Sequence, residues 1–294
     1  MKILWLSFSL ITAEPWHASL PQAQIVFYDR LPNPIDRSML DIASNACADI
    51  ILFCGIAAWE RMPSLETLCR LRSIAPTVFL SGDLSDPPWH PYLNTFRKRG
   101  CFNAYVNFDG NDNWPHSAPD FTALTPMSPS FFANQKPLKD RLIPFGFCGG
   151  CGSPSRREII DYLVEHAGLQ IKPREEQYGT YARYANFMKE CQLTVNVPHS
   201  GSDNSEQVKG RVLEAGLAGT CLLEHEASAA RHWFDAGTDY IVYRTKEEAA
   251  MIARGLLENV TLMQETALRL QRKVIENHSP EKFWARVFEA VGVR

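Results

Sequence analysis

A glycine-rich turn between an apolar run and a helical stretch has the composition of an anion-binding loop. The segment is PFGFCGGCGSPSRREII, residues 144–160. A strand that enters such a turn and leaves it as a helix exposes backbone N–H groups at the helix N-terminus, where hydrogen bonds and the helix dipole stabilise a phosphate. A first-turn arginine adds charge-assisted contacts. The loop is therefore expected to bind phosphate through Gly149, Gly150, Ser153 and Arg156.

Two other interpretations of this loop stay open. The segment has neither a Walker lysine nor the strict dinucleotide fingerprint, so it also fits an ordinary tight turn with solvated arginines. Cys148 and Cys151 have the spacing of a redox pair or of half a zinc site. Because the sequence offers no second ligand pair, no metal is expected.

A second charged cluster opens a predicted helix further along the chain. In EQVKGRVLEAGLAGTCLLE, residues 206–224, Glu206 and Glu214 bracket Lys209 and Arg211. A glutamate at the start of a helix can accept hydrogen bonds from a ribose diol or sugar hydroxyls, and the basic pair can meet a diphosphate. The alternative is an amphipathic helix whose apolar residues face the core while its charges are solvated.

A histidine and several acids follow apolar runs in the first half, at the strand ends where α/β sheets bind their ligands. His17 titrates near neutrality when unperturbed, which suits a general base. A histidine beside a tryptophan also fits a packing role. The candidates for catalysis are His17, Asp83 and Glu14, with Asp86 and Asp109 as further strand-end acids.

The apolar runs that carry these candidates alternate with helical stretches. Nearly continuous apolar runs separated by helices indicate parallel sheets covered on both faces. In the first half the predicted strands are KILWLSF, IVFYD, DIILFCG, TVFLSGD and NAYVNFD. In the second half they are RLIPFGF, LTVNV, TCLLE and YIVY. The sequence thus predicts two α/β halves.

A segment rich in Pro, Asn and Ser, residues 110–139, separates the two halves. Such a composition is poor material for helices or central strands. The predicted division is a first domain, 1–139, that includes this linker, a second domain, 140–279, and a C-terminal amphipathic helix, 280–294.

Helix ends can be assigned from local signals in the second half. Ser155 with Glu158 and Thr245 with Glu248 are capping-box pairs, and glycines stand where C-terminal glycines belong. The helices are expected over about 155–167, 178–190 and 206–218, and the glycines are Gly168 and Gly219.

Composition limits the partners. A formal charge of -3 and a pI near 6.3 argue against nucleic acid or an acidic membrane as the main partner. Eight irregularly spaced cysteines indicate reduced thiols and a cytoplasmic protein. No segment is apolar for the length that a bilayer needs, so no transmembrane segment is expected. Residues 1–13 fit either a first buried strand or a short signal peptide.

From about residue 178 onward the chain resembles the C-terminal part of GT-B glycosyltransferases, most closely the CgeB-like group. The order of short motifs carries the resemblance, which covers over a third of the chain. The matching residues are Tyr181, Tyr184, the strand LTVNV, Arg211, Glu214, Ala215 and Gly219, followed by LLE, WFDAGTDYIVYRTKEE and the helical tail ending near His278.

The resemblance implies a GT-B fold, with two Rossmann-like domains facing a cleft and a C-terminal helix that crosses back to the first domain. The first domain would receive the acceptor, and the second would bind a nucleotide sugar, most readily a UDP- or GDP-linked one, without a metal or other cofactor. It also implies that Glu214 contacts the ribose. The spacing from Glu206 to Glu214 resembles the paired glutamates of retaining enzymes. The acceptor, whether glycan, protein or small molecule, is left open.

The chain departs from the family pattern after the Arg211 helix. Thr220 replaces the usual Pro, and residues 225–227 replace a frequent Gly-Gly pair. The sugar, and retention or inversion, therefore stay open. A two-domain solute-binding protein, a nucleotide-sugar epimerase of the same fold and a non-catalytic relative are the alternatives.

Overall fold

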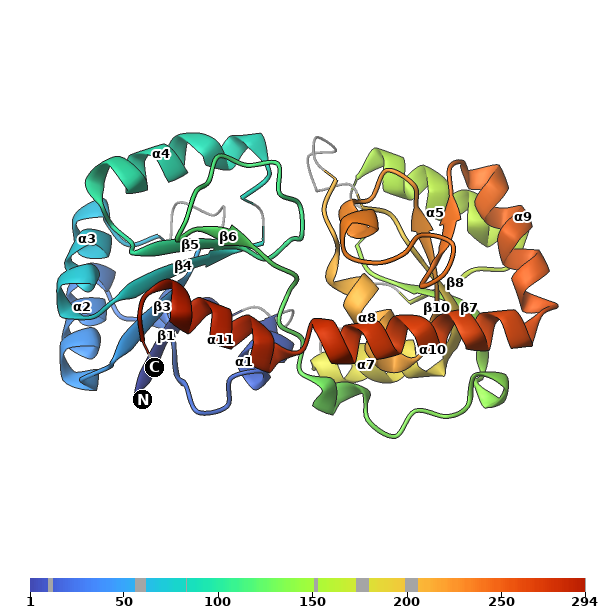
Figure 1. Cartoon of the computed structure of the whole chain (residues 1–294), viewed down its shortest axis with the longest axis horizontal. Helices are drawn as coiled ribbons and strands as arrows, with labels where there is room; N and C mark the ends of the chain where they lie inside the picture. The colour runs from blue at the N-terminus through green and yellow to red at the C-terminus, as the bar shows by residue number, and fades with distance from the viewer. Residues whose placement is uncertain are drawn as a thin grey trace. The chain divides into compact units, whose positions relative to one another are not determined.

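The computed structural model describes residues 1–9, 13–55, 62–82, 84–150, 153–172, 180–198 and 206–293. The chain divides into two compact units. Unit 1 consists of Met1–Pro126 and Pro280–Arg294, and unit 2 of Met127–Ser279. Each unit is built on its own parallel sheet, which confirms the predicted two-sheet α/β fold (Figure 1).

Unit 1 contains a six-stranded sheet with the strand order β2-β1-β3-β4-β5-β6, in which every pairing is parallel. Helices α2, α3 and α4 lie on one face of this sheet, and α1 and α11 lie on the other (Figure 1). In chain order the elements are β1 Ile3–Ser7, α1 Glu14–Ala18, β2 Gln24–Phe27, α2 Ile35–Ala46, β3 Ile50–Cys54, α3 Leu65–Ile74, β4 Thr77–Ser81, α4 His90–Arg99, β5 Ala104–Asn107, β6 Phe121–Thr122 and α11 Pro280–Ala290.

The core of unit 1 is rich in aromatic side chains, and the last helix completes it. Trp284 of α11 packs edge-on against Trp5 of β1, with the ring centroids 5.0 Å apart, and its indole N–H donates to Ser19 Oγ at 2.9 Å. Arg286 lies over the Phe121 ring, 4.0 Å from its centroid. The C-terminal helix therefore returns to the first sheet, as the resemblance implied.

Residues near the start of the chain form a central strand. All of β1 is buried, and it pairs with β2 on one side and β3 on the other. The segment Ile3–Ser7 thus forms a buried strand, as the first of the two interpretations of this region predicts.

Unit 2 contains a five-stranded sheet with the order β11-β10-β9-β7-β8, again parallel throughout. Helices α5 and α9 lie on one face, and α7, α8 and α10 lie on the other (Figure 1). In chain order the elements are β7 Ile143–Cys148, α5 Pro154–Ala167, β8 Gln170–Lys172, α7 Tyr181–Glu190, β9 Cys191–Asn196, α8 Gly210–Ala218, β10 Cys221–His225, β11 Ile241–Tyr243, α9 Lys246–Leu257 and α10 Val260–Asn277.

The predicted cap of α5 and the predicted start of α8 are wrong. Helix α5 is capped by Ser153, which accepts from the Arg156 backbone N–H, and not by Ser155, because Pro154 occupies the first helical position, which suits its fixed φ and missing N–H. Helix α8 starts at Gly210, so Glu206 precedes it.

The other helix-end signals are confirmed. Thr245 caps α9 by accepting from the Glu248 backbone N–H at 3.2 Å. Gly168 and Gly219 end α5 and α8 with φ of 67° and 61°, the left-handed conformation that favours glycine at this position.

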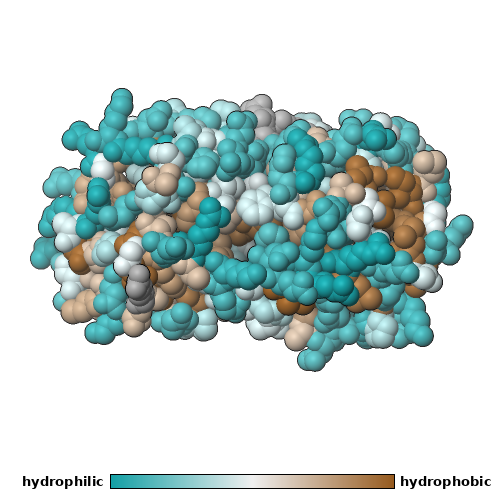
Figure 2. Space-filling view, in the orientation of Figure 1, coloured by the Kyte–Doolittle hydropathy of each residue, from teal (hydrophilic) through white to brown (hydrophobic). Residues whose placement is uncertain are grey.

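The face of the molecule shown in Figure 2 carries mostly hydrophilic residues, with hydrophobic residues in smaller groups between them. Within the described parts of the chain, no helix combines the length and apolar character needed to span a membrane.

Candidate functional site

The candidate site lies in unit 2, where β7, β9 and β10 end and α8 begins. The carboxyl ends of parallel strands are the usual ligand-binding edge of an open α/β sheet. Arg211, in the first turn of α8, is at the centre of this edge. Its side chain is only 8% exposed, so the predicted alternative of solvated charges is wrong for this helix.

Three neighbours fix the guanidinium of Arg211. Nη1 donates to Asn196 Oδ1 at 3.1 Å, and Nη2 donates to the Cys148 carbonyl oxygen. The guanidinium carbon lies 4.3 Å from the centroid of the Phe147 ring. A Cβ atom at Gly149 would overlap Nη2, so this glycine leaves the space that the guanidinium fills.

Arg211 retains donor capacity. An arginine carries five N–H donors, and the two contacts above use two of them. Its Nε is buried and has no hydrogen-bond partner among the residues that the structure describes. A buried guanidinium with an unused donor is suited to a ligand that accepts hydrogen bonds, such as a phosphate.

Asn196 and Glu224 form a buried pair beside Arg211. They are register partners at the ends of β9 and β10, and both side chains are fully buried. Asn196 Nδ2 donates to both Glu224 carboxylate oxygens, at 3.0 and 2.9 Å. Burial raises the pKa of Glu224 to about 7, against the lowering effect of hydrogen bonds from Asn196 and Ser228.

Glu214 follows Arg211 by one helical turn, and two tyrosines of α7 bind it. Tyr181 Oη donates to Oε1 at 2.5 Å, and Tyr184 Oη donates to Oε2. Burial raises the pKa of Glu214, while the tyrosine hydrogen bonds and Arg211 oppose that effect. Burial also raises the pKa of both tyrosines well above the usual value, so they remain protonated donors.

The start of α5, after the glycine-rich loop, offers fewer backbone N–H groups than the sequence suggests. Pro154 has no N–H, and the Ser153 side chain takes the N–H of Arg156, so two of the first helical donors of α5 are not offered to a ligand. Arg156 itself donates to the carbonyl oxygens of Gly150 and Val197, both at 3.1 Å. Arg156 therefore joins the loops that follow β7 and β9. Cys151 lies outside the described residues.

Lys209 and Glu206, the other residues predicted to bind the nucleotide sugar, lie in the segment just before α8. The hydrogen bonds of Arg211 described above do not involve them. Lys209 is the N-cap residue of α8, provides no side-chain cap, and its Nζ donates to Gln207 Oε1. Glu206 is partly exposed, and the next residue, Gln207, donates its backbone N–H to the Pro198 carbonyl at 3.1 Å. Among the described residues, α8 thus has no side-chain cap of the kind that Ser153 provides for α5.

Two of the three predicted catalytic residues of unit 1, Glu14 and His17, lie on α1. His17 is 9% exposed, its Nε2 lies 2.9 Å from Ser7 Oγ, and it packs edge-on against Trp5. Burial lowers its pKa to about 4, so the ring is neutral and a weak base at pH 7. These features favour the packing role. Glu14 is the first residue of α1, and Asp83 lies outside the described residues.

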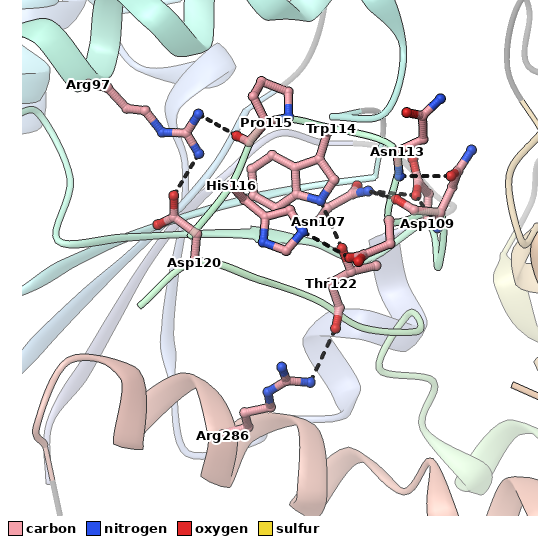
Figure 3. A network of polar contacts seen from close by, with 12 residues as sticks. Arg97, Asn107, Asp109, Asn113, Trp114, Pro115, His116, Asp120, Thr122 and Arg286 are labelled. Atoms are coloured by element: carbon pink, nitrogen blue, oxygen red, sulfur yellow. Dashed lines mark hydrogen bonds and ion pairs between the residues drawn. The ribbon is translucent and has the colours of Figure 1, made fainter. Parts of the chain in front are cut away.

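The strand ends of unit 1 carry a polar network (Figure 3). Asp109 Oδ1 accepts from Asn107 Nδ2 at 2.7 Å and from the Asn111 backbone N–H at 2.8 Å. Asp109 Oδ2 accepts from Ser85 Oγ at 2.7 Å. Nearby, Asp120 pairs with Arg97 at 2.6 Å. A buried aspartate with three donors is well satisfied, which indicates a structural role.

Sequence reasoning missed Asn196, Glu224 and Phe147 as members of the site. All three lie in strands that the sequence predicted, but only the register of β9 and β10 places Asn196 opposite Glu224. Tyr181 and Tyr184 belong to the motifs that carry the resemblance, but the sequence does not predict their contact with Glu214. Among the described residues, no group of His, Cys, Asp and Glu could hold a metal ion.

The sequence and the fold both match known glycosyltransferases. Residues 156–289 match the family described as glycosyl transferase-like. No curated protein sequence matches the chain significantly. The fold is similar to that of HepE from Anabaena in complex with UDP-glucose, with a TM-score of 0.68, 11% identity, and 99% of each chain covered.

Two further solved structures share the fold. A glycosyltransferase from Rickettsia africae gives a TM-score of 0.64 at 11% identity, with 98% of each chain covered. An α1,3-fucosyltransferase with GDP-fucose gives 0.51 at 12% identity, covering 99% of this chain and 90% of that one. The chain therefore has the fold of GT-B glycosyltransferases, and its second half matches a glycosyl transferase-like family.

Proposed function

We propose that the chain transfers a sugar from a nucleotide sugar to an acceptor hydroxyl, with the donor diphosphate bound by Arg211 at the N-terminus of α8. The observation that carries this proposal is the buried guanidinium of Arg211, whose Nε has no partner among the described residues. The uncapped first turn of α8 adds backbone N–H groups and the positive end of the helix dipole. The diphosphate would accept from both.

The same groups would assist departure of the nucleoside diphosphate. Negative charge develops on the leaving diphosphate as the bond to the sugar breaks, and preorganised donors in a buried site stabilise that charge most effectively. Arg211 and the α8 N-terminus are positioned before the reaction by Asn196, Cys148 and Phe147. A metal would then not be required, so we propose a metal-independent transfer.

We propose that Glu214 also contacts the donor ribose. Each carboxylate oxygen can accept more than one hydrogen bond, so the tyrosine contacts leave acceptor capacity for a ribose hydroxyl. Tyr184, whose hydroxyl binds Glu214, is partly exposed. The adjoining loops are proposed to provide further contacts with the nucleotide sugar, through Gly149, Gly150, Ser153, Lys209 and Glu206.

A UDP- or GDP-linked sugar is the proposed donor. HepE was solved with UDP-glucose and the fucosyltransferase with GDP-fucose, and both share the fold of this chain. The resemblance of the C-terminal half to the CgeB-like group supports placement in that subgroup, and the cysteine content supports a cytoplasmic enzyme. The acceptor, a glycan, protein or small molecule, would be activated from unit 1, with Asp83 and Glu14 as the proposed candidates for a base, because the buried His17 ring favours packing.

The test is nucleotide binding by thermal shift with UDP, GDP, CMP, ADP and dTDP. We expect one nucleoside diphosphate to raise the melting temperature of the wild type and to have much less effect on Arg211→Lys, because lysine cannot donate from a planar fork. Glu190→Gln is the control, since Glu190 pairs with Lys136 on the surface of the same unit. Equal shifts in Arg211→Lys and the wild type would refute the assigned site.

The role of Glu214 needs a second comparison. Glu214→Gln removes the charge but keeps one acceptor for a tyrosine, whereas Tyr181→Phe removes one tyrosine donor and leaves the carboxylate. If Glu214 binds ribose, Glu214→Gln should weaken nucleotide binding more than Tyr181→Phe does. Similar losses in both variants would assign Glu214 to the internal network alone.

A second experiment tests catalysis. Mass spectrometry can detect hydrolysis of the nucleotide sugar in the absence of an acceptor, which separates a transferase from a nucleotide-binding relative without catalysis.

A further inference from the structure

The side-chain amide of Asn196 has one end that donates and one that accepts, and its surroundings fix which end faces Arg211. Both oxygens of Glu224 accept from Nδ2, at 3.0 and 2.9 Å. An ionised carboxylate can only accept, so the donor end of the amide must face Glu224. The acceptor, Oδ1, is thereby directed at Arg211, whose Nη1 lies 3.1 Å away.

We propose that Glu224 and Asn196 are positioning residues that act in series to hold the Arg211 guanidinium in the orientation that binds the donor diphosphate. The inference rests on the proposed function, because it assigns these residues a role through Arg211. Neither side chain is placed against the donor itself. Glu224 orients Asn196, and Asn196 orients Arg211.

The backbone around the pair limits its movement. Asn196 and Glu224 are opposite each other in the β9 and β10 register, and both side chains are fully buried. The hydroxyl of Tyr243, on the next strand but one, donates to the Asn196 carbonyl oxygen at 2.8 Å. The series of hydrogen bonds from Glu224 to Arg211 therefore starts within the buried part of the sheet and ends at a side chain whose Nε has no described partner.

The arrangement serves orientation better than stability. Burying a carboxylate without a directly bonded cation is costly, and apolar residues of similar size commonly stabilise such a position as well or better. The positive charge of Arg211 acts on Glu224 without a described hydrogen bond between them, and Asn196 is hydrogen-bonded to both. A rigid guanidinium loses less entropy when it binds a ligand, so supporting residues of this kind improve binding geometry.

The test exchanges the positions of the amide and the carboxylate in the pair. In Asn196→Asp two carboxylates face each other, and in Glu224→Gln the amide of Asn196 loses the partner that fixes its direction. In the double variant, Asn196→Asp with Glu224→Gln, the aspartate accepts both from the new amide and from Arg211. The double variant has the same net charge as the wild type and restores the hydrogen-bond series.

Binding is measured by calorimetry at pH 8, where Glu224 is largely ionised, with UDP and GDP and with the nucleosides uridine and guanosine. Circular dichroism and melting temperature check that each variant is folded. We expect each single variant to weaken binding of the preferred nucleoside diphosphate about tenfold, and the double variant to recover to within about threefold of the wild type. Nucleoside binding should change little, because the nucleoside lacks the phosphates. Arg211→Lys is the positive reference, and Glu190→Gln is the control.

The outcomes separate the two hypotheses. If Arg211→Lys weakens diphosphate binding while folded Glu224→Gln and the double variant both match the wild type, the positioning role is overturned and the proposed function stands. A double variant as weak as Asn196→Asp also overturns it. If nucleoside and nucleoside diphosphate lose affinity equally, the pair only maintains the fold. If Arg211→Lys binds normally, or no nucleoside diphosphate binds the wild type, both the proposed function and this inference fail.

Discussion

The strand ends of the two sheets carry buried ions of opposite character. In unit 1, Asp109 accepts from three uncharged donors that come from its own loop and the neighbouring strand end (Figure 3). In unit 2, Arg211 is anchored by one amide and one carbonyl and keeps a buried Nε without a described partner. The comparison shows that equivalent edges of two parallel sheets can treat a buried charge differently: the first unit surrounds it with hydrogen bonds, and the second leaves one of its donors without a described partner.

The largest effect expected from this comparison is on the stability of unit 1. Asp109→Ala would leave the donors of Asn107, Asn111 and Ser85 without their acceptor. The variant should lose about 3 kcal/mol of unfolding free energy, measured by urea titration, because buried unsatisfied donors cost about 1–3 kcal/mol each. Its affinity for nucleoside diphosphate should not change. Normal stability together with weakened nucleotide binding in this variant would contradict the prediction, because Asp109 would then serve binding and not stability.

The next effect is the pH dependence contributed by Glu224. Its pKa in the folded protein, about 7, lies above the usual value of 4.5, so the folded state binds more protons than the unfolded state between these values. Its contribution therefore makes the protein less stable as pH rises from about 4.5 to about 7, and is constant above that. Because Glu224→Gln lacks this titration, its unfolding free energy should rise by about 2 kcal/mol relative to that of the wild type as pH increases across this window. A difference between their urea midpoints that stays constant from pH 5 to pH 8 would contradict this.

His17 should give the opposite slope. Burial lowers its pKa from 6.5 to about 4, so the unfolded state binds more protons between these values. The stability that it contributes is full above about pH 6.5 and is lost as pH falls toward 4. The glutamine in His17→Gln cannot be protonated. As pH falls from 6.5 to 4.5, the wild type should therefore lose up to about 2 kcal/mol more unfolding free energy than the variant. Equal acid sensitivity of the two proteins would mean that the ring is accessible to protons in the folded state.

The smallest expected change concerns the space beside Arg211. A Cβ at Gly149 would overlap the guanidinium, so Gly149→Ala should displace Arg211 from Asn196 while the folded structure persists. We expect about a tenfold loss of nucleoside diphosphate affinity, equal to about 1.4 kcal/mol, by calorimetry. Gly255→Ala is the matched control, because no atom lies within 4 Å of a Cβ at that position. Similar affinities in both variants would show that the loop can move without disturbing Arg211.

The sequence predicts the fold better than it predicts the site. Apolar runs and helix-end residues locate both sheets because burial and backbone conformation act locally, as at Thr245 and Gly219. The start of α5 differs from the prediction because Pro154 takes the first helical position. The start of α8 differs because a polar segment that resembles a helix start remains extended up to Lys209.

The site depends on residues that are distant in the sequence. Arg211 and Glu214 could be selected as candidates because they are close together on one helix. Asn196 and Glu224 become partners only through the register of β9 and β10, which no local pattern specifies. The same limit applies to His17, since its position at a strand end suggests a base, whereas its contacts with Trp5 and Ser7 depend on how the sheet is packed.

The return of α11 to unit 1 has a consequence for the order in which the chain can fold during synthesis. Domains generally fold as units as they leave the ribosome, starting from the N-terminus. Unit 1 obtains Phe283, Trp284 and Val287 for its core only from the last 15 residues of the chain. All of unit 2 is translated before those residues. The half whose synthesis starts first is therefore the half whose core is completed last. A chain released at residue 279 would have all of unit 2 but a unit 1 whose apolar surface still lacks its covering helix.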